Sequence, residues 1–148
     1  METSDVRILL VEDFIPYRTF VGSLLSETPG LRVIGEASDG LEAVEKAQQL
    51  KPDVILMDIG LPVLNGLDAT RRIRELVPSS KIVFLTMEAS VEVAEEALSR
   101  GACGYIVKDQ AGSELLEGLA AVLRGERFIS RCLSDNGFTP KNGKHAAA

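Results

Sequence analysis

The feature of this sequence that most constrains its fold is a regular alternation of apolar, β-rich runs with segments of helical periodicity. The apolar runs lie at residues 6–11, 31–37, 53–57, 81–86 and 104–108. Each run is followed by a stretch in which apolar residues recur at the spacing of an amphipathic helix. A strand and a helix repeated in this way predict a mainly parallel sheet with right-handed crossovers and helices on both faces.

Cap and turn residues mark the ends of the predicted helices. Asp39 and Glu42 have the spacing of a capping box, and Gly101 and Gly125 stand where helices commonly end. The pattern favours an α/β protein with a doubly wound, five-stranded parallel sheet. We expect the flavodoxin-like (βα)5 strand order 2-1-3-4-5, in which sites form at the carboxyl ends of the strands.

Polar residues stand at the ends of four predicted strands. Glu12 and Asp13 follow the first strand, Asp58 follows the third, Thr86 ends the fourth and Lys108 ends the fifth. If strands one and three are neighbours, the three acids converge at one edge of the sheet. The run before Asp58 is apolar enough to be covered on both faces, so this carboxylate loses solvation unless a partner or ligand compensates.

The three acids together predict a site for a hard divalent cation. Close carboxylates repel one another and take up protons unless a cation intervenes, and Mg²⁺ suits a site with few carboxylates and a phosphate ligand. The main-chain carbonyl of Gly60 adds a candidate ligand. With the Lys108 ammonium and the Thr86 hydroxyl nearby, Asp58 is predicted to be a nucleophile that forms an acyl phosphate.

Each of these residues also has a plainer explanation when it is taken alone. Glu12 or Asp13 could cap the first helix, Thr86 could be an ordinary strand residue, and Lys108 could be a solvated strand end. Tyr105 reads as a half-buried strand aromatic. All of these explanations must hold together at the ends of successive core strands, so the joint pattern favours a site.

Four stretches in this order resemble the receiver domain of two-component response regulators, over about residues 6–124; they are "LVEDF", "LMDIGLPVLNG", "VFLTM" and "GACGYIVKD". The resemblance implies a phosphorelay switch that takes its phosphoryl group from a sensor histidine kinase and forms a homodimer on phosphorylation. It implies a signalling domain, not an enzyme, with only self-phosphorylation from a donor and slow self-dephosphorylation.

The resemblance also implies a role for each matching position. Asp58 resembles the phosphorylated aspartate, while Thr86 and Lys108 resemble the residues that contact the phosphoryl group. Tyr105 resembles the aromatic that turns inward as that threonine moves. The implied Mg²⁺ ligands are Glu12, Asp13, Asp58 and the carbonyl of Gly60.

Two positions depart from the usual receiver pattern. Many receivers have a proline after the lysine, with a cis bond, where this chain has Asp109. A cis bond before a residue other than proline costs about 2.5–4 kcal/mol, so the sequence leaves the geometry of the Lys108–Asp109 bond open. Met87 and Glu88 follow Thr86 where smaller residues would leave the phosphate more open. We therefore predict a partly shielded acyl phosphate.

The C-terminal region, residues 125–148, is expected to be a linker and tail. Its stretch "RFISRCLSD" resembles the linker that leads into a LuxR-type helix-turn-helix output domain, whose helices are missing from the sequence. The tail is expected to be cut before that DNA-binding domain or to carry appended residues, with disorder after about residue 134. DNA would then be bound only through the missing domain. The rival hypothesis is a stand-alone receiver that acts by docking partner proteins.

Composition excludes several other classes of protein. The net charge of −6 disfavours nonspecific binding of nucleic acid, and the cluster of Arg71, Arg72 and Arg74 reads as a solvated helix face. Cys103 and Cys132 form no CxxC motif, which argues against a zinc site or a disulfide framework. The apolar runs are too short to span a bilayer and no signal peptide is apparent, so we expect a cytoplasmic protein.

Two other functions compete with the switch. A phosphohydrolase could use Asp58 as its nucleophile, but such enzymes usually need a second acid two positions on, where this chain has Gly60. A flavodoxin-like cofactor binder would need a glycine-rich phosphate loop after the first strand, and "VEDFIPYR" has neither GxGxxG nor GxxxxGK. The main prediction remains a phosphorylation-controlled switch whose output is transcription.

Overall fold

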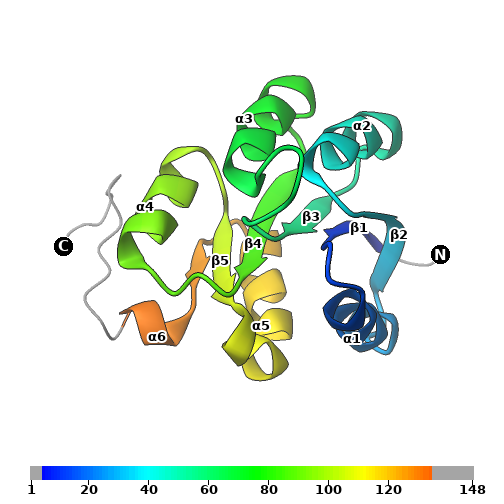
Figure 1. Cartoon of the computed structure of the whole chain (residues 1–148). Coiled ribbons are helices and arrows are strands. Elements are labelled where there is room, and N and C mark those ends of the chain that lie inside the picture. Colours follow the sequence, from blue (N-terminus) through cyan, green and yellow to red (C-terminus); the bar gives the residue numbers. More distant parts are fainter. Residues whose placement is uncertain (1–4, 135–148) are drawn as a thin grey trace.

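The computed structural model describes residues 5–134, and its helices and strands alternate along the chain (Figure 1). The strands are β1 (Val6–Val11), β2 (Leu31–Ala37), β3 (Val54–Met57), β4 (Lys81–Thr86), β5 (Gly104–Val107) and β6 (Phe128–Ile129). The helices are α1 (Ile15–Ser26), α2 (Gly40–Leu50), α3 (Gly66–Leu76), α4 (Val91–Ser99), α5 (Ala111–Leu123) and α6 (Arg131–Ser134). A short 3-10 turn, η1 (Lys108–Gln110), joins β5 to α5.

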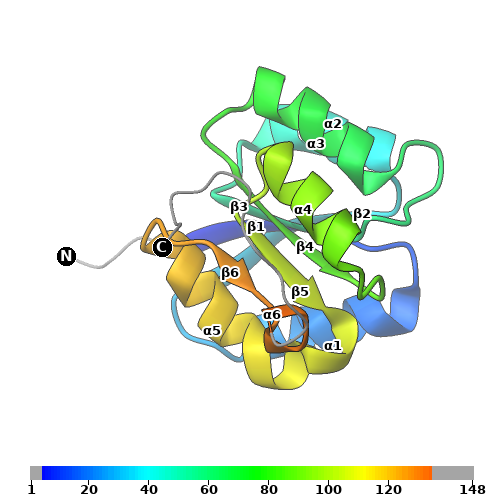
Figure 2. The same ribbon diagram turned by 90° about the vertical axis from the view of Figure 1, so that its left-hand side faces the viewer.

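All neighbouring strands of the sheet are parallel, in the order β2-β1-β3-β4-β5-β6. The flavodoxin-like α/β fold and the order of the first five strands are thereby confirmed. The sixth strand was not predicted, because Phe128 and Ile129 lie in the segment that the sequence indicates to be a linker. Figure 2 shows β6 beside β5 at the edge of the sheet, between α4 and α5.

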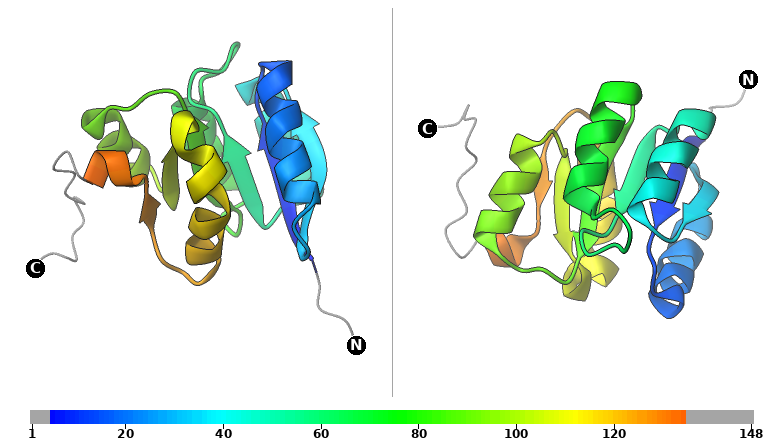
Figure 3. Two further views of the ribbon diagram at one scale, coloured as in Figure 1. Left: turned by 90° about the horizontal axis from the view of Figure 1, so that it is seen from below. Right: turned by 45° about the horizontal axis from the view of Figure 1, so that its top comes forward.

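Helices cover both faces of the sheet, and alternate strand residues point to opposite faces. Helices α2, α3 and α4 pack on one face, and α1 and α5 pack on the other (Figure 3). In β1, Leu9 and Val11 belong to the first of these two cores, whereas Ile8 and Leu10 belong to the second. This period of two within a continuous apolar run is the pattern of a strand that is buried on both faces.

The predicted cap residues act as the sequence indicates. The side chain of Asp39 accepts a 2.7 Å hydrogen bond from the amide of Glu42 at the start of α2, and the Glu42 side chain accepts a 2.8 Å bond from the amide of Ser38, one residue before the position in an ideal capping box. Gly101 and Gly125 follow the ends of α4 and α5 with φ angles of +108° and +89°, a conformation that glycine adopts without steric cost. These caps end the helices where the chain must turn back into the sheet.

The strand β2 is one edge of the sheet, and its pairing with β1 is irregular. Ile8 is paired with Val33 but Leu9 with Gly35, so one residue of β2 is left without a partner between them. Such a bulge increases the local twist of an edge strand. At the opposite edge, β6 is only two residues long.

The segment after α5 is held to the sheet by a buried polar network. The Ser130 hydroxyl donates a 2.6 Å hydrogen bond to Glu114 Oε1 and accepts a 2.8 Å bond from the Val107 amide. Glu114 Oε2 accepts bonds from the amide and the guanidinium of Arg131, at 3.1 and 3.2 Å. Ser130 is fully buried and Glu114 is 1% exposed, so the network stabilises the docked segment by satisfying a buried charge.

The structure settles one question that the sequence left open, the geometry of the Lys108–Asp109 bond. No peptide bond between residues 5 and 134 is cis, so the Lys108–Asp109 bond that the sequence left open is trans. The expected disorder after residue 134 lies outside the described residues. Within residues 5–134 no helix is both long enough and apolar enough to cross a membrane.

Candidate functional site

The predicted acids meet at the carboxyl ends of β1 and β3. Val11 is paired with Met57, so Glu12 and Asp58 leave adjacent strands at the same level. One carboxylate oxygen from each of Glu12, Asp13 and Asp58 lies within 4.8 Å of the others. The parallel register of the sheet thus brings together residues that are far apart in the sequence.

Lys108 joins this acidic cluster from the end of β5. Its Nζ lies 2.8 Å from Glu12 Oε1 and 3.2 Å from Asp58 Oδ2. Burial disfavours the charged ammonium, but the hydrogen bond to Glu12 and the charge of Asp58 outweigh it, so the pKa of Lys108 is raised. Lys108 is therefore positively charged throughout the physiological range, and its ammonium pairs with two of the three acids.

The first turn of α1 adds Tyr17, which the helical pattern identifies only as a core-facing residue. The Lys108 Nζ lies 4.7 Å from the centroid of its ring, and its hydroxyl donates a 3.2 Å hydrogen bond to the Lys108 carbonyl. Burial, followed by the negative charges of Glu12, Asp109 and Asp58, raises the pKa of Tyr17 to about 12. The sequence carries no signal for this contact, because helical spacing places Tyr17 on the buried face of the helix without showing which loop that face meets.

A second residue that the sequence did not reveal is Arg18, which hydrogen-bonds to the backbone of the loop between β1 and α1. Its Nη1 donates to the Glu12 carbonyl at 2.9 Å and to Ser38 Oγ at 3.0 Å, and its Nε lies 3.4 Å from Glu36 Oε1. The Glu12 carboxylate is also fixed, because Oε2 accepts a 3.0 Å bond from the Phe14 amide. Phe14 is the N-cap of α1, so neither acid is the cap residue of that helix.

The loop after β3 holds Asp58 against the start of α3. The Gly60 amide lies 3.5 Å from Asp58 Oδ1, a long hydrogen bond, and the Gly66 amide donates to the Ile59 carbonyl at 2.7 Å. A Cβ on Gly66 would lie 2.3 Å from the backbone oxygen of Asp58. Glycine is therefore required at this position for the helix to approach the loop so closely.

Thr86 and Tyr105 are linked through the loop after β4. The Glu88 amide donates a 3.3 Å hydrogen bond to Thr86 Oγ1, and the Tyr105 hydroxyl donates a 2.7 Å bond to the Glu88 carbonyl. Tyr105 is fully buried and lies inward, against Phe84. Burial, and then the charge of Glu88, raises its pKa. Thr86 and Tyr105 thus bond to the backbone amide and the backbone carbonyl of the same loop residue, Glu88.

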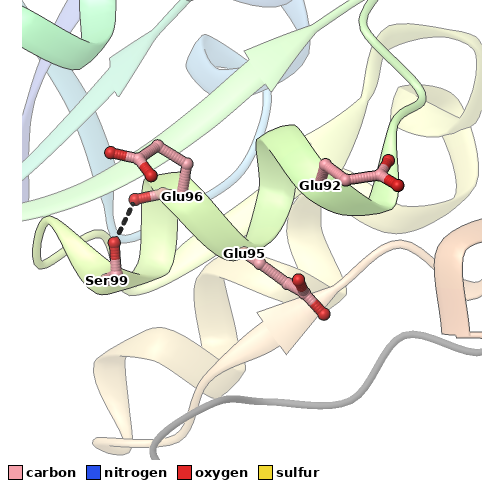
Figure 4. A pocket seen from close by; sticks show the side chains of 4 residues that line it. All are labelled: Glu92, Glu95, Glu96 and Ser99. Carbon is pink, nitrogen blue, oxygen red and sulfur yellow. Dashed lines mark hydrogen bonds between the residues drawn. The ribbon is translucent and has the colours of Figure 1, made fainter.

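A surface hollow on α4 is lined by residues other than those of the predicted site. Figure 4 shows it on α4, where its lining consists of Glu92, Glu95, Glu96 and Ser99. The Ser99 hydroxyl donates a 2.8 Å hydrogen bond to the Glu96 carbonyl of the same helix. None of the predicted site residues lines this hollow, so the site is a cluster at the sheet edge and is distinct from it.

Comparisons with known proteins identify the family of this chain. Residues 8–120 match the family model described as the response regulator receiver domain. The chain is 39% identical to the nitrate/nitrite response regulator NarL of Escherichia coli K12, over 86% of this chain and 59% of that protein. It is 37% identical to the response regulator GacA of Pseudomonas viridiflava, over 84% of this chain and 58% of that protein.

A solved structure shows the same likeness. It is a LuxR-family two-component response regulator from Aurantimonas sp. SI85-9A1, which is 34% identical, with a TM-score of 0.85 over 89% of this chain and 94% of that one. The chain spans less than two thirds of the length of the two curated relatives above. Together with the family match over residues 8–120, these likenesses show that the chain belongs to the receiver domain family of two-component response regulators.

Proposed function

We propose that this chain is a phosphorylation-controlled switch in which Asp58 accepts a phosphoryl group from the phosphohistidine of a sensor kinase. The observation that carries the proposal is the position of Lys108, whose ammonium bridges Asp58 and Glu12 at the ends of three strands. Asp58 is 12% exposed at its side chain, which leaves one side of the carboxylate accessible to a donor. A nucleophile, a cation and an acidic pair therefore share one edge of the sheet.

The donor set fits Mg²⁺. One oxygen from each of Glu12, Asp13 and Asp58 lies within 4.8 Å of the others, and Lys108 forms ion pairs with Glu12 and Asp58. We propose these three carboxylates and the Gly60 carbonyl as the ligands. When bound, Mg²⁺ would neutralise charge on the phosphoryl oxygens during transfer.

The chain's own residues perform the transfer as follows. A carboxylate oxygen of Asp58 attacks phosphorus, the phosphorus–nitrogen bond of the donor breaks, and the imidazole nitrogen leaves with the electron pair. Lys108 supplies a fixed positive charge to the phosphoryl oxygens, and the Thr86 hydroxyl donates a hydrogen bond to them. The product is an acyl phosphate on Asp58.

The same contacts carry the signal onward. Thr86 and Tyr105 both hydrogen-bond to Glu88, so a movement of the Thr86 hydroxyl toward the phosphoryl group changes the loop that holds the Tyr105 hydroxyl. We propose this loop as the two-state element that phosphorylation biases. The acyl phosphate is then lost by slow hydrolysis, in which water attacks and inorganic phosphate and the free Asp58 carboxylate are released, so we propose a signalling domain that does not turn over a substrate.

The output that we propose is transcription, through a LuxR-type DNA-binding domain outside this sequence. The relatives named as response regulators support this output, as does the solved LuxR-family structure. We propose a homodimer as the phosphorylated form. Because the kinase draws its phosphoryl group from ATP, the cytoplasm is the proposed compartment.

The test is intact-mass spectrometry after incubation with acetyl phosphate, with and without Mg²⁺. We expect one labile phosphoryl group on the wild-type chain that needs Mg²⁺ and is lost in Asp58→Asn. Asp5→Asn, at an exposed acid before β1, is the matched control and should take up the group like the wild type. Uptake by Asp58→Asn, or no uptake by the wild type, would contradict the proposal.

A further inference from the structure

Tyr17 contacts Lys108 at both ends of the residue. Its hydroxyl donates a 3.2 Å hydrogen bond to the Lys108 main-chain carbonyl, and its ring lies 4.7 Å from the Lys108 ammonium. The ring is itself supported by Phe20 one turn on, with ring centroids 5.5 Å apart. Tyr17 is half-buried in the second core, so its ring has a fixed orientation toward the site.

The other partners of the Lys108 ammonium are carboxylates that have a second role. Glu12 and Asp58, at 2.8 and 3.2 Å from Nζ, are also members of the candidate metal cluster. A divalent cation on these oxygens competes with Lys108 for their charge and weakens both ion pairs. The face of an aromatic ring attracts an ammonium without carrying a charge of its own, so a metal does not take it away.

We propose that Tyr17 is a positioning residue for Lys108, and that its ring keeps the ammonium at the phosphoryl site when the carboxylates bind metal. This inference rests on the proposed phosphoryl transfer to Asp58. Lysine has a long, flexible side chain, and holding it in place avoids the entropic cost of ordering it during the reaction. The hydroxyl contact fixes the backbone of Lys108, and the ring fixes its tip.

Substitutions separate these two contacts. Tyr17→Phe keeps the ring and removes the bond to the carbonyl, while Tyr17→Leu and Tyr17→Met remove both. Leu76→Ala is the control, because it removes an exposed apolar side chain at the end of α3 that lies away from Asp58. Thermal melts followed by circular dichroism show whether each variant is folded. If Tyr17→Leu does not fold, Tyr17→Met replaces it in the measurements below.

The first readout is the rate of phosphorylation by acetyl phosphate, measured over a range of Mg²⁺ concentrations. Loss of a partly desolvated cation–π contact predicts a maximal rate lower by about three- to tenfold in Tyr17→Leu and Tyr17→Met. The Mg²⁺ concentration for half-maximal rate should stay within about twofold of the wild type, because the acids are intact. Tyr17→Phe should recover most of the rate, and Leu76→Ala should match the wild type.

The second readout does not depend on activity. In ¹⁵N spectra of the Mg²⁺-loaded protein, the Lys108 ammonium signal, assigned by its loss in Lys108→Arg, should exchange its protons with water faster in Tyr17→Leu than in the wild type. A Tyr17→Leu protein with a wild-type maximal rate and wild-type exchange would overturn the proposal, as would a Tyr17→Phe protein impaired as much as Tyr17→Leu. If the wild type took up no phosphoryl group, the proposed function would fail, while the exchange measurement would still decide whether Tyr17 holds Lys108.

Discussion

Replacement of Ser130 by alanine tests whether the segment after α5 is an integral part of the folded domain. The hydroxyl of Ser130 donates to Glu114 Oε1 and accepts from the Val107 amide, so its removal leaves two buried groups without those partners. Glu114 retains its bonds from Arg131 at the other carboxylate oxygen. The substitution therefore isolates one half of the network.

The magnitude follows from the burial of the groups left behind. A buried donor or acceptor without a partner costs about 1–3 kcal/mol, and a charged group costs more. With Ser130 fully buried and Glu114 1% exposed, we expect Ser130→Ala to lower the free energy of unfolding by roughly 2–5 kcal/mol if the segment stays docked. If the segment detaches instead, the free energy of unfolding should fall by less than this, because Glu114 is then hydrated by water.

Urea unfolding measures the free energy, and amide hydrogen exchange shows whether the loss is local. The amide of Ser130 donates to the Tyr105 carbonyl at 2.9 Å, so its protection reports on docking of the segment. Ser113→Ala, which removes an exposed hydroxyl at the start of α5, should change the free energy by less than about 0.5 kcal/mol. If Ser130→Ala matched that control in both stability and exchange, the reasoning from buried partners would be refuted.

Three further predictions concern the phenols, the exposed Met87 and the glycine beside Asp58. The chain has two tyrosines and no tryptophan, so a near-ultraviolet titration follows the phenols directly; burial raises both pKa values above 10.0, that of Tyr17 to about 12. The phenolate absorbance of the folded chain should stay flat through pH 10, whereas that of the chain unfolded in urea should rise near pH 10. Because the folded chain keeps its phenolic protons to a higher pH than the unfolded chain, the free energy of unfolding should fall as pH rises from 10 toward 12. Met87→Ala should speed hydrolysis of the acyl phosphate by about two- to fivefold by admitting water, as followed by mass after the donor is removed, and an unchanged rate would count against shielding. Gly66→Ala should destabilise the chain by about 1–3 kcal/mol in urea, because its Cβ would lie 2.3 Å from the Asp58 backbone oxygen, whereas Gly22→Ala, which meets nothing within 4 Å, should not destabilise it.

The central sheet could be predicted because its signals are local and repeated. The runs at residues 6–11 and 81–86 coincide with β1 and β4, since continuous apolar residues between helical segments indicate buried parallel strands. The strand β6 could not be predicted in this way, because two residues carry no periodicity. It forms through tertiary contacts, including the buried bonds of Ser130 to Glu114 and Val107.

The convergence of the acids with Lys108 could be predicted because a parallel sheet places the ends of neighbouring strands together. The roles of these residues remain proposals. Tyr17 and Arg18 could not be identified, since helical spacing shows which face a residue lies on but not which loop that face meets. The steric requirement for glycine at position 66 could not be predicted either, because the close approach of its backbone to Asp58 exists only in the folded chain.

The two edges of the sheet bear on how copies of this protein meet. An exposed edge strand can pair with another chain and lead to aggregation, and proteins limit this with bulges, charges and short strands. Here β2 has the bulge near Gly35 and exposed Arg32 and Glu36, and β6 is two residues long. Neither edge is a good template for a further strand, so the sheet resists open-ended growth. The homodimer that we propose is therefore expected to form across the helices, where contacts can be made and broken without disturbing the sheet.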